Sequence, residues 1–228
     1  MREETFRSIC FVALSACSAE NDAPASVVGS DAGHEEPGEA DAFDDGISAA
    51  DASNGGDAEM GRLEGMTAAH NAVRAMVATT PAIPPLMWSS TLAAYAQEWA
   101  TTLASNPATC AQPQHRPASE LQANDYGENL ADYLGEMSPV ITAQQVVDVW
   151  ADEKACWTYG TIQGTAACNM TCIANLHSDD CGHYTQIVWR KTLELGCGVA
   201  TCKSGGLMED IWICNYSPAG NGAGETPY

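Results

Sequence analysis

Two polar side chains fall on faces that the sequence predicts to be apolar. Residues 139 to 157 have the apolar spacing of a helix, and Glu153 follows Trp150 by three residues, so its carboxylate shares the inward face. An unpaired charge there is costly, so Glu153 needs a buried partner or a functional site. The alternative interpretation is a carboxylate at the helix edge that reaches Lys154 or Arg190.

The second such side chain is His183. Residues 183 to 189 alternate like a strand, which places His183 on one face with Thr185, Ile187 and Trp189. A histidine in that company is a hydrogen-bonded core residue or a cleft residue, and periodicity favours the core residue. Carboxylates and imidazoles are the groups of acid–base catalysis and of metal binding, but neither residue defines a site by itself.

Motifs of well-known catalytic machinery are absent from the sequence. It contains no Gly-x-Ser-x-Gly nucleophile elbow and no His-Glu-x-x-His helix. The run Gly220-x-Gly222-x-Gly224 is rich in glycine, but the sequence ends before a helix could follow it. We therefore predict a flexible tail here and not a phosphate-binding loop.

Helices are predicted in the first half of the domain. Thr67 is the expected cap of the first helix, whose inward stripe includes His70. One of the serines at positions 89 and 90 caps the second helix, and Pro139 begins the third, which reaches about Trp157. The buried stripe of the second helix contains Leu92, Tyr95, Ala96, Trp99 and Leu103.

Short strands are predicted in the second half. Residues 199 to 201 and 211 to 213 flank a loop with Gly205-Gly206 at its centre, and that dipeptide suits a two-residue hairpin turn. The register set by this turn places Cys197 opposite Cys214.

Charge separates the chain into three parts. Residues 18 to 61 carry twelve acidic residues and no Lys or Arg, so we predict a disordered linker there. Of the formal net charge of −21, this linker accounts for more than half, and −9 stays on the domain at residues 62 to 228. Nucleic-acid binding is not expected from so acidic a protein, because phosphate recognition requires Lys and Arg.

The first 17 residues have features of an export signal. Arg2 and Arg7 precede a short apolar run, and Leu14-Ser15-Ala16-Cys17 resembles the processing box of bacterial lipoproteins. We expect export to the extracellular space or cell surface, with Cys17 lipidated as the only membrane anchor. Ordinary signal cleavage and a misassigned start are the alternatives. Ten cysteines in an exported chain indicate disulfides.

Three spaced signatures identify a family resemblance. They are Gly127-Glu128-Asn129-Leu130, the stretch from Cys181 to Trp189, and the stretch from Ile213 to Asn221. Together they closely resemble the CAP superfamily of cysteine-rich secretory, antigen five and pathogenesis-related proteins, above all its plant pathogenesis-related branch. The resemblance runs from Thr67 to Tyr228. It implies an α+β fold, a three-layer α-β-α sandwich with a mixed or antiparallel central sheet.

The resemblance also implies a cleft in which two histidines and two acids converge on a divalent cation. The matching positions are His115, Glu128, Glu153 and His183, although His115-Arg116 stands where the family has His-Ser. Two histidines predict a weak, exchangeable Zn²⁺ site, because a firm catalytic site has three direct protein ligands. His70 matches a helix position of the family that looks structural.

The same resemblance implies disulfides Cys197–Cys214 and Cys110–Cys202. Cys181 pairs with Cys172 or Cys168, and Cys156 with the cysteine left over; we favour Cys172–Cys181 with Cys156–Cys168. The alternative is a structural zinc site that uses Cys168, Cys172, His177 and Cys181.

The expected function is that of a secreted or surface-anchored protein that binds lipid, sterol or a cell-surface protein. One alternative is a metal-dependent hydrolase in which Glu128 or Glu153 is the catalytic base. Another is a precursor of a signalling peptide, because residues 218 to 228 match the C-terminal peptide pattern of the plant branch.

Overall fold

The structure is a computed structural model of the whole chain, and it describes residues 5–8, 59–137, 141–176, 178 and 180–228. Cys17, His177 and most of the predicted acidic linker lie outside these ranges. None of the helices in these ranges has both the length and the hydropathy of a membrane span.

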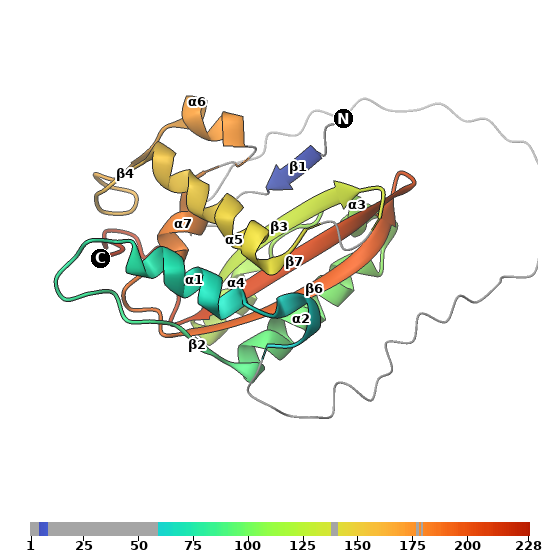
Figure 1. Cartoon of the computed structure of the whole chain (residues 1–228), viewed down its shortest axis with the longest axis horizontal. Helices are drawn as coiled ribbons and strands as arrows, with labels where there is room; N and C mark the ends of the chain where they lie inside the picture. The colour runs from blue at the N-terminus through green and yellow to red at the C-terminus, as the bar shows by residue number, and fades with distance from the viewer. Residues whose placement is uncertain (1–4, 9–58, 138–140, 177, 179) are drawn as a thin grey trace, which may run out of the picture. The chain divides into compact units, whose positions relative to one another are not determined.

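A five-stranded sheet forms the middle of the domain, with strand order β1-β3-β7-β6-β2 (Figure 1). Only β2 runs parallel to its neighbour β6, and the other pairs are antiparallel. The predicted mixed sheet is therefore correct. The strands are β1 (Thr5–Ser8), β2 (Met87–Trp88), β3 (Gly127–Gly135), β6 (Glu194–Ser204) and β7 (Leu207–Ser217).

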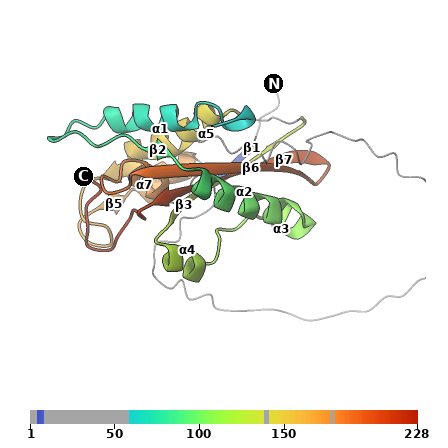
Figure 2. The same cartoon turned by 90° about the horizontal axis from the view of Figure 1, so that it is seen from below.

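Helices cover both faces of the sheet, which confirms the predicted three-layer sandwich (Figure 2). On one face lie α2 (Ser90–Ala104), α3 (Pro107–Ala111) and α4 (Ala118–Asn124). On the other lie α1 (Met66–Ala75), α5 (Ala143–Asp152) and α7 (Gly182–Ile187). Smaller elements complete the domain: η2 (Gly61–Leu63), η3 (Glu153–Cys156), β4 (Trp157–Thr158), β5 (Ala167–Cys168), α6 (Met170–Ile173) and η4 (Ala174–Leu176).

The central strand β7 contributes to a core on each face of the sheet. Ile211 and Ile213 pack with α2, whereas Trp212 and Tyr216 pack with α1, α5 and α7. This is the alternation of side chains that a strand imposes. On β6, a Cβ atom at Gly198 would lie 2.3 Å from the backbone of Gln97, so glycine lets α2 lie directly on the sheet.

The hairpin register is as predicted, and the strands are longer. Gly205 and Gly206 have positive φ angles of 59° and 87°, as the two-residue turn requires. Cys197 lies opposite Cys214 and forms a disulfide with it.

Two helix boundaries differ from the prediction. The third helix begins at Ala143, where Thr142 and Gln145 form a capping box, and it tightens into η3 at Glu153. The first helix starts at Met66, and the backbone N–H of Thr67 donates to the Glu59 carboxylate. Ser89, one of the two serines expected to cap the second helix, is the N-cap position of α2.

Four disulfides join the described cysteines, and two predicted pairings are wrong. Cys110–Cys202 is correct, but the structure has Cys156–Cys172 and Cys168–Cys181 in place of Cys156–Cys168 and Cys172–Cys181. The reason lies at Asn169: its N–H donates to the Cys156 carbonyl while its side chain caps α6, which brings Cys172 onto Cys156. All three cysteines of the alternative zinc site are in disulfides, so the site has no thiolate to bind zinc.

The glycine-rich C-terminal segment is not a free tail. The Gly220 N–H donates to the Gln186 side chain at 2.9 Å, and Gly224 and Glu225 form backbone hydrogen bonds with Ile162. Tyr228 packs against Trp157. The prediction of a flexible tail is therefore wrong.

Candidate functional site

His115 and Glu128 form the first of two buried His–Glu pairs. Glu128 lies on β3, next to Asn215 on β7, and is 2% exposed. Its Oε1 accepts from His115 Nδ1 and from the backbone N–H of Arg116, each at 2.9 Å, and its Oε2 accepts from Asn215 Nδ2 at 3.2 Å. This carboxylate therefore fixes the orientation of the imidazole.

Arg116 anchors the chain beside His115, a role that sequence reasoning missed. Its guanidinium lies 3.8 Å from the ring centroid of Tyr95 and 5.0 Å from that of Trp99. It also donates to the Tyr95 carbonyl at 2.9 Å and pairs with Glu98. These contacts hold the irregular segment between α3 and α4, where no regular backbone hydrogen bonding would otherwise place His115.

The second pair is His183 with Glu153. Glu153 is buried, as its inward position predicted, and its Oε1 accepts from His183 Nδ1 at 2.5 Å and from Ser178 Oγ at 2.6 Å. Its Oε2 accepts from the Tyr184 N–H at 2.9 Å. The edge position toward Lys154 or Arg190 is excluded by this burial.

His183 lies in α7 and not in the predicted strand. All residues from His183 to Ile187 are buried, so the alternation of residue types did not mark an exposed and a buried face. The imidazole stacks on Trp150 of α5, with centroids 5.8 Å apart and planes 22° apart. The ring is thus held by an aromatic face and by a carboxylate.

Asp180 lies beside the second pair, and no sequence motif indicated it. Burial raises the pKa of the Asp180 carboxyl group. The charge of His183, the hydrogen bond from the Gly182 N–H and, more weakly, the charge of His115 lower this pKa. Glu153 adds to the rise. Ser178, which donates to Glu153, also lies 3.2 Å through its Oγ from the Asp180 carbonyl, so Asp180 adjoins the second pair.

His70 has the structural role that its helix position predicted. It is fully buried, and its ring nitrogens bond the Met66 carbonyl and the Tyr216 hydroxyl, each at 2.8 Å. Burial lowers its pKa to about 4. Both nitrogens are engaged inside the core, so His70 is not part of the candidate site.

The available donor atoms limit how a metal ion could bind at this site. Because each Nδ1 faces a carboxylate, Nε2 is the nitrogen with which each imidazole would bind a cation, and the glutamates take the orienting role of outer-shell carboxylates. Among the residues that the structure describes, no group of three or more His, Cys, Asp or Glu side chains could hold a metal ion. A cation would thus have at most the two imidazoles as protein ligands, a set that fits weak binding.

Comparison with known proteins agrees with the fold. The model of the CAP family, the cysteine-rich secretory protein family, matches residues 67–216. Pathogenesis-related protein 1A of Nicotiana tabacum is 37% identical over 160 residues, which are 70% of this chain and 77% of that protein. Pathogenesis-related protein 1 of Arabidopsis thaliana is 36% identical over 160 residues, or 70% and 78% of the two chains. Among solved structures, BmVAL-1 has a TM-score of 0.55 at 24% identity and covers 77% of this chain and 85% of its own.

Fold and motifs together define the class, a disulfide-bonded α-β-α sandwich with paired histidines and glutamates. The chain belongs to the CAP family, and its pathogenesis-related relatives cover most of the domain. The four disulfides fit the extracellular location that this family suggests.

Proposed function

We propose that this protein is an exported CAP-family binding protein whose His115 and His183 hold one divalent transition-metal ion weakly. The observation that carries the proposal is that both imidazoles are buried and oriented through Nδ1 by a carboxylate. That arrangement fixes the ring and raises the basicity of the other nitrogen, as in established metal sites. A bound cation would polarise whatever water or ligand oxygen completed its coordination.

Calorimetric titration with ZnCl₂ tests the proposal on the full chain. His115→Ala and His183→Ala should each abolish binding, whereas His70→Ala should keep the affinity and lower the unfolding temperature. Binding should also weaken on acidification, because a protonated ring has no lone pair to donate. Undiminished binding in both site variants, checked for folding by circular dichroism, would refute the metal site.

Binding is favoured over hydrolysis by the surroundings of the glutamates. Glu128 and Glu153 already accept hydrogen bonds from their histidines and from backbone N–H groups, and both are buried. A general base must reach the proton of a substrate or water, and these carboxylates face protein donors. A panel of ester, peptide and glycan substrates should therefore show no turnover, and turnover lost in Glu153→Gln would contradict the binding function.

The ligand that we propose for the domain as a whole is a lipid or sterol or a cell-surface protein, on the ground of family membership alone. Saturable binding of a fluorescent sterol by the full chain is the first measurement to make.

Surface attachment through Cys17 is a separate proposal. Cleavage before Cys17 would remove β1 together with the leader and leave β3 as the edge of the sheet. Cys17→Ser should move the protein from the membrane to the soluble fraction. An unchanged fractionation would contradict the anchor.

A further inference from the structure

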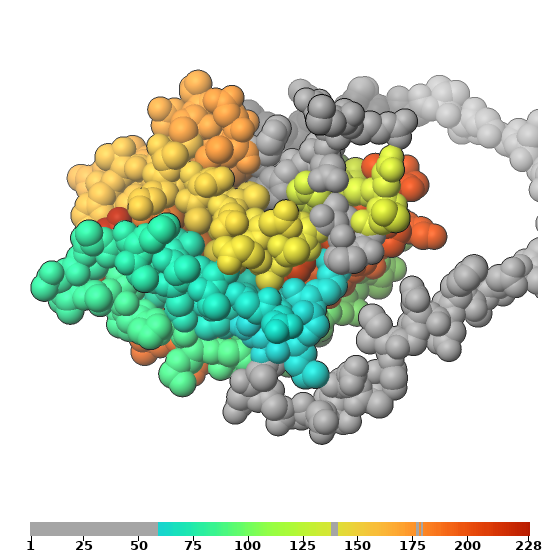
Figure 3. Space-filling view, viewed as in Figure 1, coloured from blue at the N-terminus to red at the C-terminus, as the bar shows by residue number. Residues whose placement is uncertain are grey.

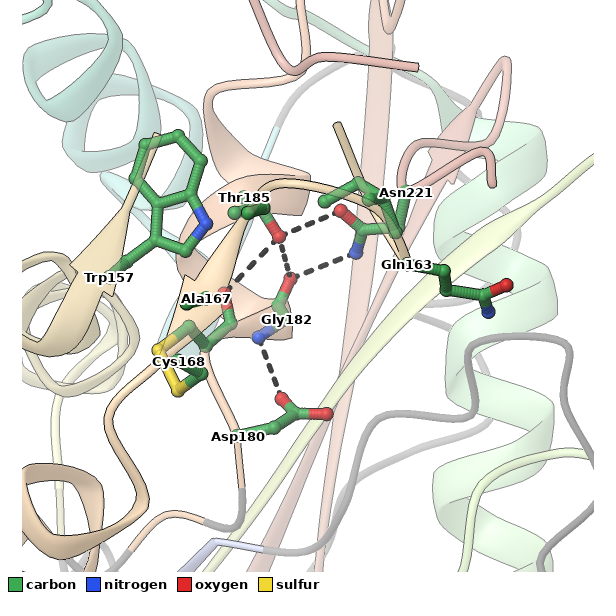
Figure 4. Close-up of a pocket in the computed structure, with 11 residues that line it drawn as sticks. Trp157, Gln163, Ala167, Cys168, Asp180, Gly182, Thr185 and Asn221 are labelled. Carbon is green, nitrogen blue, oxygen red and sulfur yellow. Dashed lines mark hydrogen bonds between the residues drawn. A yellow bond between two sulfur atoms is a disulfide. The ribbon is translucent and has the colours of Figure 1, made fainter. Parts of the chain in front are cut away.

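A pocket lies beside the disulfide Cys168–Cys181, and Asp180, which adjoins the second His–Glu pair, is part of its lining. It has a volume of about 160 Å³ and is formed by the loop before β5, the start of α7 and the C-terminal segment (Figure 4). None of the four residues of the His–Glu pairs lines it. The side chains that carry the argument are those of Trp157, Ile162, Ala167, Asp180, Thr185 and Asn221.

The walls of this pocket are held in place before any ligand binds. The disulfide ties β5 to the residue before α7. Asn221 accepts from the Thr185 hydroxyl at 2.7 Å and donates to the Gly182 carbonyl at 3.0 Å, which joins the C-terminal segment to α7. These polar groups satisfy one another, as the dashed lines in Figure 4 show, so the pocket is preformed.

Asp180 gives the pocket a negative charge. It is the only ionisable side chain in the lining, and none of the seven Lys and Arg of residues 62 to 228 takes part. Its Oδ1 accepts from the Gly182 N–H at 2.6 Å, and in Figure 4 the other carboxylate oxygen points away from that bond. The net charge of −9 on the domain favours a cation here as well.

Besides this charge, the lining of the pocket has an apolar and aromatic part. The indole of Trp157 is partly exposed and lines the pocket with Ile162 and Ala167. An indole face attracts cations and also packs against hydrocarbon. A ligand that satisfies both parts of the lining has one positive charge and a compact apolar body.

We propose that this pocket is a binding site for small organic ammonium compounds, with Asp180 as the counter-ion and Trp157 as the aromatic wall. The ammonium group takes the place beside the carboxylate, and the apolar part of the ligand covers the indole and the alanine. A neutral molecule of the same shape lacks the charge-assisted hydrogen bond and should bind more weakly.

Benzylamine and benzyl alcohol form a matched pair of probes, since they differ only in the charged group. Titration of the ¹⁵N-labelled full chain, without metal, should shift the amides of Gly182 and Thr185 and the indole N–H of Trp157. Benzylamine should bind roughly tenfold more tightly than the alcohol or better, the range of a hydrogen bond to a charged group.

Two variants separate charge from space. Asp180→Asn keeps an acceptor for the Gly182 N–H and should bring benzylamine down to the affinity of the alcohol. Ala167→Leu fills the pocket and should weaken both probes, whereas Glu194→Gln, an exposed acid on β6, should change neither.

Equal affinity for the two probes, or amine binding that survives Asp180→Asn, would overturn the proposal. So would shifts that appear at the His–Glu pairs and not at the pocket. Circular dichroism of each variant confirms that a lost signal reflects the pocket and not unfolding, and a folded wild type that binds no benzylamine at millimolar concentration also refutes the site.

Discussion

Acidification should weaken the fold through His70, which is buried between α1 and β7. Its Nδ1 donates to the Met66 carbonyl and its Nε2 accepts from the Tyr216 hydroxyl, so the ring is neutral in the folded protein. Burial is the main cause that lowers the pKa of His70 from 6.5 to about 4, and the charge of Arg74 lowers it further. A protonated Nε2 could no longer accept the hydrogen bond from the Tyr216 hydroxyl, so protonation would break this bond.

The direction of the effect follows from proton uptake. Between pH 6.5 and about 4 the unfolded chain binds a proton at this position and the folded protein does not, so acid favours unfolding. The contribution of His70 is fully present above pH 6.5 and is lost as the pH falls through this window. At 1.36 kcal/mol per pKa unit the total is ~3 kcal/mol, of which about 2 kcal/mol is lost between pH 7 and pH 5.

Urea unfolding of the disulfide-bonded protein at pH 7 and pH 5 measures this loss. The control is His70→Leu, which has a side chain of similar size that does not titrate. It should be less stable by ~1 to 3 kcal/mol at pH 7, because the Met66 carbonyl and the Tyr216 hydroxyl lose their partner. The wild type should lose about 2 kcal/mol more than the variant on acidification. Equal losses would show that His70 does not titrate as its burial implies.

Three further predictions concern packing and covalent structure. Gly198→Ala should destabilise the domain by ~1 to 3 kcal/mol in urea, since the new methyl group meets the α2 backbone; an unchanged midpoint would contradict the close approach. Arg116→Lys should lower the unfolding temperature, because lysine cannot reproduce the stack on Tyr95 with its hydrogen bonds; retention of full stability would disprove that role. Peptide mapping without reduction should recover Cys156–Cys172 and Cys168–Cys181, and the exchanged pairs would show that the fold around α6 is wrong.

Local signals predicted the elements that depend on local chemistry. The two glycines of the β6–β7 turn set the hairpin register, and the serine at position 89 marks the start of α2. The stretch from His183 to Trp189 was predicted as a strand because alternating residue types are normally half exposed. Here every residue from 183 to 189 is buried, so the alternation carried no information on the element.

Prediction of the candidate site from sequence would have required knowledge of contacts between distant parts of the chain. Burial of Glu153 could be predicted from its helix face, but not its partners, which lie 25 to 31 residues away. The longer run between His115 and Glu128 is explained by α4, which takes up residues 118 to 124. His115 lies 2.9 Å from Glu128 across this helical segment, so the stretched spacing does not separate the pair.

The signature segments meet at one buried side chain, Gln186. A Cβ atom at Gly127 would lie 2.1 Å from its Oε1, and one at Gly220 would lie 2.7 Å from its Nε2. The amide also accepts from the Gly220 N–H and donates to Thr192 Oγ1 at 3.2 Å. The glycines are therefore places of close approach and not of flexibility. Since Gly127 precedes Glu128 and Gln186 lies one helical turn from His183, this contact ties the strand that carries the first pair to the helix that carries the second.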